Sequence, residues 1–146
     1  MKAITLHQPW ASLIIMGAKK FETKNWKTYF RGPLLIHAAP KLPSRAASQK
    51  LMANPYINKF IKDINILPFG AVIGKCELVG IYPTEDISNP ATIMNIMLTD
   101  QEKAFGDFSP GRYVWGLDEI VQFKNPLPHK GTMWLWEFPN KLLPKE

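Results

Sequence analysis

The chain has 146 residues, 46% of them hydrophobic and 21% charged, and it carries a formal net charge of +6. This length and composition suit a single globular domain over residues 1–146 that forms its own core, and they exclude a disordered chain. Because no apolar run approaches the roughly 20 residues of a membrane helix, and residues 1–10 lack a signal-peptide pattern, we expect a cytoplasmic protein with no membrane partner.

The first elements are a short strand and a short helix. Ala3–Leu6 reads as a strand, and Pro9 fits the first turn of a helix with Gln8 or His7 at the cap. Trp10, Leu13 and Ile14 recur at helical spacing, and Gly17 supplies a left-handed stop after about two turns. The pattern therefore predicts a two-turn helix with one face packed inward.

Two further strands are predicted before residue 40. Residues 20–26 alternate, which would place Glu22, Lys24 and Trp26 on one face and Thr23 on the other. Pro33–Ala39 is an almost continuous apolar run, as expected of a central strand that is covered on both sides.

The middle of the chain predicts helices and then a long strand. Ser44 caps a helix from Arg45 to about Ala53, and a second helix starts at Pro55, with apolar residues every four positions at Tyr56, Phe60 and Ile64. We expect both helices to cover one side of the sheet. Residues 70–82 form the longest predicted strand, and its interior glycines suggest a bend or a close backbone approach.

The last part of the chain predicts one helix and three strands. Thr99 and Glu102 have the spacing of a capping box for a helix that ends at Gly106. The three strand candidates are residues 112–117, 120–123 and 133–138. Many short strands with few helices predict a small closed or partly closed barrel.

Positive charge is concentrated in the first part of the chain. Residues 1–62 contain eleven Lys or Arg and one acid, a net of +10, whereas residues 63–146 contain seven and eleven, a net of −4. An electropositive region attracts polyanions, among which nucleic acid is the commonest inside cells. A solubilising surface would have the same composition, so charge alone leaves both interpretations open.

Two arginines stand next to glycines, Arg31 in YFRGP and Arg112 in SPGRYVWG. The planar guanidinium suits phosphate or base edges, and an adjacent glycine lets a ligand approach the backbone. Ion pairs across the barrel are the alternative for both.

Glu22 and Trp26 are the other binding candidates from the residues alone. Glu22 is the only acid in the basic region, so it could orient a cation or accept a hydrogen bond from a base, or simply pair with Lys20 or Lys24. Trp26 has Lys24 and Lys27 nearby and could stack on a base, whereas most of the five tryptophans are expected in the core.

The sequence offers no signature of a metal or cofactor site. Cys76 is the only cysteine, which excludes an intrachain disulfide, and the histidines His7, His37 and His129 are far apart. No nucleophile elbow, phosphate-binding loop or zinc-protease motif occurs. We therefore expect neither a metal nor a cofactor.

Several motifs together resemble the ASCH domain family, named for its homology to activating signal cointegrator 1. They are HQPWASL, the pattern GxKxxExK formed by Gly17, Lys19, Glu22 and Lys24, and the segments YFRGPLLIHAA, LPFGAVIGKCELVGI, PGRYVWGL and PLPHKGTMWLWE. The resemblance covers nearly the whole chain. It implies an α+β fold, a small mixed β-barrel of PUA-like type with short helices packed around it.

The resemblance also implies a cleft that receives RNA or a nucleoside-like or nucleotide-like ligand. Carried over by position, Lys19, Glu22, Lys24 and Arg31 would line it, with Trp10, Glu77 and Arg112 nearby. The family pattern has Arg where this chain has Lys24, so a bidentate contact would become a single point charge. The expected function is RNA or nucleotide binding, with a role in RNA metabolism or transcription regulation.

Two alternatives remain open at this point. One is a hydrolase, either a ribonuclease or an enzyme like the family's N4-acetylcytidine amidohydrolases, in which Lys19, Glu22 and Glu77 would be catalytic. Those amidohydrolases use a Thr where this chain has Glu22, and Thr23 is expected on the opposite face, so the match is incomplete. The other alternative is an interaction module whose basic face meets an acidic protein partner.

Overall fold

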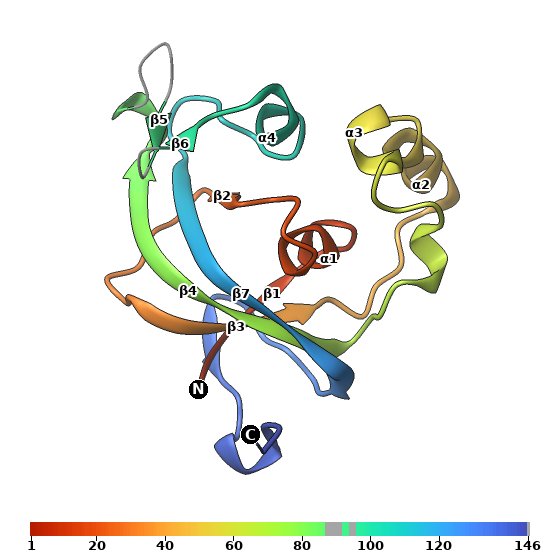
Figure 1. Ribbon diagram of the computed structural model, residues 1–146, viewed down its shortest axis with the longest axis vertical. Coiled ribbons are helices and arrows are strands. Elements are labelled where there is room, and N and C mark those ends of the chain that lie inside the picture. Colours follow the sequence, from red (N-terminus) through yellow and green to blue (C-terminus); the bar gives the residue numbers. More distant parts are fainter. Residues whose placement is uncertain (87–91, 94–95, 146) are drawn as a thin grey trace.

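A curled six-stranded sheet forms the centre of the computed structural model, which describes residues 1–86, 92–93 and 96–145 (Figure 1). The strand order is β2-β7-β4-β3-β1-β8. The strands are β1 (Lys2–Leu6), β2 (Phe21–Lys24), β3 (Gly32–Ala38), β4 (Ala71–Pro83), β7 (Tyr113–Pro128) and β8 (Leu135–Glu137). Only β1 and β3 pair in parallel, so the sheet is mixed. Because β2 and β8 are its two edges, the barrel is only partly closed, as predicted.

Short helices complete the fold. They are α1 (Trp10–Ile15), α2 (Arg45–Met52), α3 (Pro55–Asn58) and α4 (Asp100–Ala104), with 3-10 turns at Ile64–Ile66, Thr84–Asp86 and Asn140–Leu142 and a small hairpin of β5 (Thr92–Ile93) and β6 (Ile96–Met97). None of the helices within the described ranges has the length and apolar character needed to cross a membrane.

Helix α1 lies between two cores. Its residues Ile14 and Ile15 belong to the barrel core, whereas Leu13 belongs to a second core shared with α3 and Phe105. Gly17 has φ +82° and ends the helix as predicted. The predicted cap is shifted by one residue. Pro9 stands at the N-cap, and the side chain of Gln8, one residue earlier, accepts from Ser12 N in the first turn at 2.9 Å.

The region from α2 to the 3-10 turn differs from the prediction. Ser44 caps α2 as expected, its hydroxyl accepting from Ala47 N. However, α3 ends at Asn58, and the buried residues are Ile57, Ile61 and Ile64, while Tyr56 is exposed. These residues pack against Leu13 of α1 and against Phe105, the C-cap of α4, and not on the sheet, because α1 already occupies the face that the sheet turns toward them (Figure 1).

The two strands predicted between residues 112 and 123 are one long strand, β7. Its pairing with β4 shifts register three times, and Glu119 adopts φ +50°, so the strand bends without ending. Gly74 of β4 lies where β7 and α1 come close to the β4 backbone. A Cβ there would collide with the Val121 carbonyl and with Ile15, as the interior glycines of this strand suggested.

Candidate functional site

A cleft of about 380 Å³ opens at the mouth of the barrel, between α1, β2 and the loop that follows α4. Its lining combines apolar, aromatic and charged groups. The lining residues are Leu6, His7, Trp10, Glu22, Thr23, Lys24, Ala104, Phe105, Gly106, Asp107 and Arg112. A concave site with a few convergent polar groups is the usual form of a small-ligand site.

Strand β2 directs two of the predicted residues into this cleft. Glu22 pairs with Trp115 across the sheet, and Trp115 is fully buried in the barrel core, so Glu22 faces the barrel mouth. Lys24 lies two residues further along the same face. Thr23 points the other way, where its hydroxyl accepts from Asp107 N at 3.1 Å. The alternation predicted for this strand is therefore confirmed.

Lys19 lies beneath the cleft and does not line it. Its side chain is fully buried, and its Nζ donates to the Phe105 carbonyl at 2.8 Å. The same atom is 3.8 Å from Glu22 Oε1 and 5.7 Å from the centre of the Trp10 ring. Burial lowers the pKa of Lys19, and the nearby Glu22 carboxylate partly opposes that shift. Lys19 thus holds Glu22 in place from below. Because its side chain is fully buried, Lys19 itself does not contact a ligand in the cleft.

Glu102 is a second buried carboxylate next to Lys19. Its Oε1 accepts from Lys20 N at 2.6 Å, whereas its Oε2 is buried without a hydrogen-bond partner among the residues described. Desolvation raises its pKa. The predicted capping box is therefore only half formed. Thr99 accepts from Glu102 N, but the Glu102 side chain turns away from the helix and joins the α1–β2 loop to α4.

Gly106 is favoured for a reason other than the one predicted. The structure gives it no left-handed φ, and Phe105 serves as the helix C-cap. A Cβ at Gly106 would lie 3.0 Å from the Phe108 ring and 3.2 Å from Thr23 Cγ2. The glycine thus allows the post-helix loop to pack closely on β2.

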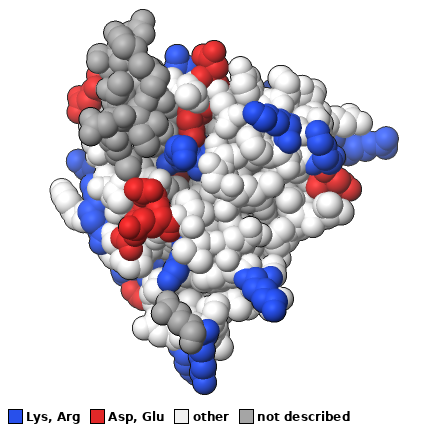
Figure 2. Space-filling view, viewed as in Figure 1, with Lys and Arg blue, Asp and Glu red and all other residues white. Residues whose placement is uncertain are grey.

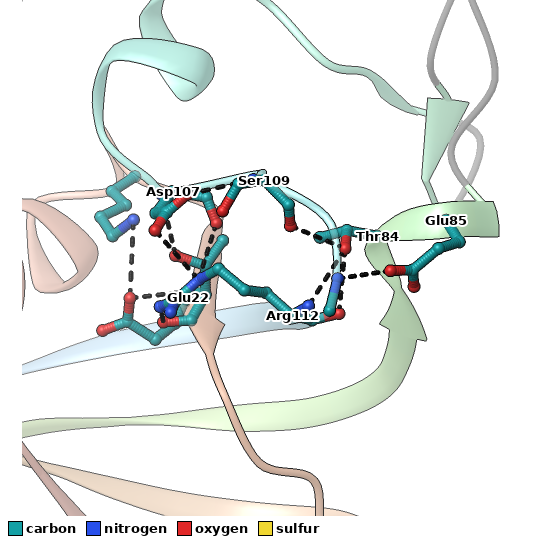
Figure 3. Close-up of polar contacts among 9 residues, drawn as sticks. Glu22, Thr84, Glu85, Asp107, Ser109 and Arg112 are labelled. Atoms are coloured by element: carbon teal, nitrogen blue, oxygen red, sulfur yellow. Dashed lines mark hydrogen bonds and ion pairs between the residues drawn. The ribbon is translucent and has the colours of Figure 1, made fainter.

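Arg112 closes the other side of the cleft (Figure 3). Its Nε donates to the Asp107 carbonyl at 3.0 Å and lies 3.4 Å from Asp107 Oδ2, and its Nη2 donates to the Thr23 carbonyl at 3.3 Å. The loop itself is tied down by Thr84, whose hydroxyl donates to the Ser109 carbonyl, and by Glu85, which accepts from Gly111 N. Arg112 is therefore both paired with an acid and placed at the cleft.

Besides Lys19, three predicted residues lie outside the cleft lining. Arg31 is exposed, and its guanidinium donates to the carbonyls of Thr28 and Phe30. Glu77 lies on β4 on the face opposite the buried Cys76, so its strand directs it away from the barrel interior. Trp26 lines an adjoining groove instead. The structure does not bring Arg31 and Glu77 to Glu22.

The cleft is less basic than the sequence indicated. Lys24 and Arg112 are balanced by Glu22 and Asp107, and Asp107 lies outside the basic half of the chain. Lys24 is half-buried and makes no ion pair or hydrogen bond with other described residues. Figure 2 shows the Lys and Arg side chains in separate groups over one face, with acidic groups between them. The positive charge that the sequence analysis assigned to one site is therefore distributed over this face of the molecule.

Sequence reasoning missed several residues of the site. His7 lines the cleft, and Asp107 orients Arg112. Glu102 lies below the cleft, where it holds the loop between α1 and β2. The sequence marked Glu102 only as a capping residue, and no sequence pattern singled out Asp107. No group of three or more His, Cys, Asp or Glu that could hold a metal occurs in the ranges described.

The family can now be established by comparison with known proteins. The sequence profile of the ASCH domain matches residues 4–113, which is most of the chain. The chain belongs to the ASCH domain family. Mouse (Mus musculus) activating signal cointegrator 1 is 36% identical to this ASCH domain over 141 residues, covering 95% of this chain and 22% of that protein. The human (Homo sapiens) activating signal cointegrator 1 is 36% identical over 78 residues, covering 52% of this chain and 13% of that protein.

This ASCH domain therefore spans about a fifth of the length of these relatives or less. Solved structures of ASCH proteins share its fold. A tyrosine-to-phenylalanine mutant of ZmASCH from Zymomonas mobilis superposes with a TM-score of 0.55 at 13% identity, covering 97% of this chain and 91% of that one. ASCH from the same organism gives a TM-score of 0.53 at 12% identity, covering 97% and 89%. At this identity the likeness shows the PUA-like fold alone, and it confirms the fold class predicted from sequence.

Proposed function

We propose that this ASCH domain binds RNA or a nucleotide-like ligand in the cleft at the barrel mouth, as part of RNA metabolism or transcription regulation. One observation carries the proposal. Glu22 stands in the cleft with Oε1 fixed by Thr23 N at 2.8 Å and by Lys19 from below. It shares the cleft lining with the Trp10 ring and with Lys24, a cation without an ion-pair partner in the described part of the chain.

Each of these groups suits one part of a nucleotide. A carboxylate accepts hydrogen bonds, so Glu22 can take the N–H of a base or a ribose hydroxyl. Trp10 is half-buried and offers an aromatic surface for base stacking. Lys24 can contact a phosphate, and Arg112 has further N–H donors besides the two that hold it to the Asp107 carbonyl of the loop and the Thr23 carbonyl of β2. Because Glu22 and Arg112 are already held by the protein, little order has to be created on binding.

The mixed charge of the cleft sets an expectation for salt. Affinity for single strands falls by about 0.7 logarithmic units per tenfold rise in salt for each phosphate neutralised. Since Lys24 is the cleft cation without an acidic partner among the described residues, we expect a slope that corresponds to about one or two phosphates. A steep slope would place the binding surface on the scattered lysines instead.

The test is binding of nucleoside monophosphates and short single-stranded RNA by the wild type and two cleft variants. We expect Glu22→Gln and Lys24→Ala each to weaken binding about tenfold. Glu77→Gln and Arg31→Ala are matched controls, because these residues carry the same charges but lie outside the cleft, and they should leave monophosphate affinity within twofold. Equal losses in cleft and control variants would contradict the proposal.

Of the three residues expected to be catalytic in a hydrolase, only Glu22 lines the cleft. Lys19 is buried and bound to the Phe105 carbonyl, and Glu77 is directed away from the cleft. The wild type and the four variants of the binding test, together with Lys19→Met, can be assayed for turnover of RNA and of N4-acetylcytidine. Turnover that requires Lys19 and Glu77 would overturn this placement. An acidic protein partner stays a prediction that no observation tests.

A further inference from the structure

A second hollow adjoins the cleft. This groove, of about 540 Å³, lies between the first strand and the segment that leads into β8. Its lining residues are Ile4, Thr5, His7, Lys24, Asn25, Trp26, Gly131, Thr132, Met133 and Trp134. His7 and Lys24 line both hollows, so they form the boundary between them. The described lining of the groove contains one lysine and no acid, so its charge suits an anion.

An exposed tryptophan is held rigidly in this groove. Trp134 is 56% exposed and adopts φ +64°, a left-handed conformation that costs a side-chain-bearing residue free energy and persists where the surrounding structure enforces it. Trp26 packs edge-on against it at 5.0 Å, and Trp115 packs edge-on against Trp26 at 4.8 Å. Trp115 is fully buried and donates its indole N–H to the Trp26 carbonyl. The three rings therefore connect the exposed indole to the barrel core.

The floor of the groove is equally fixed. Thr5 accepts from the Trp136 indole N–H at 3.1 Å and lies 3.1 Å from His37 Nδ1. Gly131 passes so close that a Cβ would collide with Thr5 and His37. The groove is thus a preformed hollow, because both its floor and its aromatic wall are tied to buried residues.

We propose that the groove receives the nucleotide next to the one in the cleft, so that the ligand is single-stranded RNA of at least two nucleotides. This inference rests on the proposed function. An aromatic ring stands in each hollow, Trp10 in the cleft and Trp134 in the groove, and a cation stands between them. That sequence of aromatic, cation and aromatic matches base, phosphate and base along a strand. An acidic peptide would pair with Lys24 but would offer the two indole rings no planar group on which to stack.

The experiment compares ligand lengths in the wild type and in Trp134→Ala. Affinities for a nucleoside monophosphate, a dinucleotide and a trinucleotide RNA are measured, with Trp fluorescence as a second readout of stacking. The wild type should bind the dinucleotide about tenfold more tightly than the monophosphate. Trp134→Ala should lose that gain and keep its monophosphate affinity. Trp134→Phe should retain most of it, and Tyr29→Ala, which removes a 94% exposed ring outside both hollows, should change nothing.

The outcomes separate the two proposals. If monophosphates bind through Glu22 but a second nucleotide adds no affinity, the groove inference fails and the proposed function stands. If Trp134→Ala weakens mono- and dinucleotide binding equally while its thermal midpoint is unchanged, the inference fails as well. If the wild type binds no nucleotide of any length, both fail. Equal affinity for DNA and RNA of one sequence would overturn the RNA assignment alone.

Discussion

The cleft and the groove lie above two different buried polar networks. Under the cleft, Lys19 and Glu102 bring charges together beneath Glu22, and Glu102 Oε2 has no partner among the described residues. Under the groove, Thr5 and His37 form a neutral network in which each polar side-chain atom has a neighbour. The difference suggests that the charged network is kept for the site above it, since burying charges seldom stabilises a fold.

The neutral network has one consistent set of proton positions. His37 Nε2 lies 2.7 Å from the His129 carbonyl, which only accepts, so this nitrogen carries the proton. Nδ1 then accepts from the Thr5 hydroxyl, whose oxygen accepts from the Trp136 indole N–H. A proton added to Nδ1 would break this chain. The groove network should therefore depend on His37 remaining neutral.

Removing the cation of the charged network should have the largest effect on stability. Lys19→Met leaves Glu22 without its buried partner and the Phe105 carbonyl without its donor, so we expect a loss on the order of 3 kcal/mol in the free energy of unfolding. Denaturant unfolding at pH 7 measures it. The neighbouring Lys20 side chain is exposed, and Lys20→Met should stay within about 0.5 kcal/mol. Equal losses would mean that Lys19 is not specifically paired.

Breaking the neutral network should cost somewhat less. Thr5→Val removes a hydroxyl of similar volume and leaves the Trp136 N–H and His37 Nδ1 without a partner, so we expect a loss of about 2 kcal/mol. Thr5→Ser keeps the hydroxyl and should recover most of that loss. If Thr5→Val unfolds at the wild-type denaturant concentration, water replaces the hydroxyl and the floor of the groove is less fixed than we infer.

Acid should weaken the neutral network. Burial lowers the pKa of His37 in the folded protein below its unfolded value near 6.5. The unfolded chain therefore binds the proton first, and stability should fall as pH drops from about 6.5 toward the folded pKa, by at most about 1.4 kcal/mol per pH unit. Unfolding curves between pH 7.5 and 5 measure the slope. His37→Gln should flatten it, and an unchanged slope would assign the effect to another group.

The charged network should show the opposite pH dependence. Burial raises the pKa of Glu102 in the folded state, so the folded protein binds a proton that the unfolded chain releases near pH 4.5. Stability attributable to Glu102 should thus fall as pH rises from about 4.5 through the folded pKa. The stability of Glu102→Gln relative to the wild type should rise over that window. A constant difference would show that the Glu102 pKa is unshifted.

Local patterns predicted most of the secondary structure. The helix stop at Gly17, the cap at Ser44, and the central strand at residues 33–39 depend on neighbouring residues, and the structure confirms them. The main error in the predicted secondary structure concerns where one strand ends and the next begins. Residues 112–123 were divided at Asp118, because a strand that bends at a left-handed Glu119 and one that stops there have the same polar interruption in sequence.

The alternation of β2 by itself placed Glu22 and Lys24 together, since side chains two residues apart in a strand share a face. Only the tertiary structure decided which cations and carboxylates meet. Lys19 is buried because α4 and Phe105 close over it, and Trp134 is exposed because its backbone turns before β8 begins. Burial and partners depend on contacts between segments about 80 or more residues apart, and composition and spacing do not record such contacts.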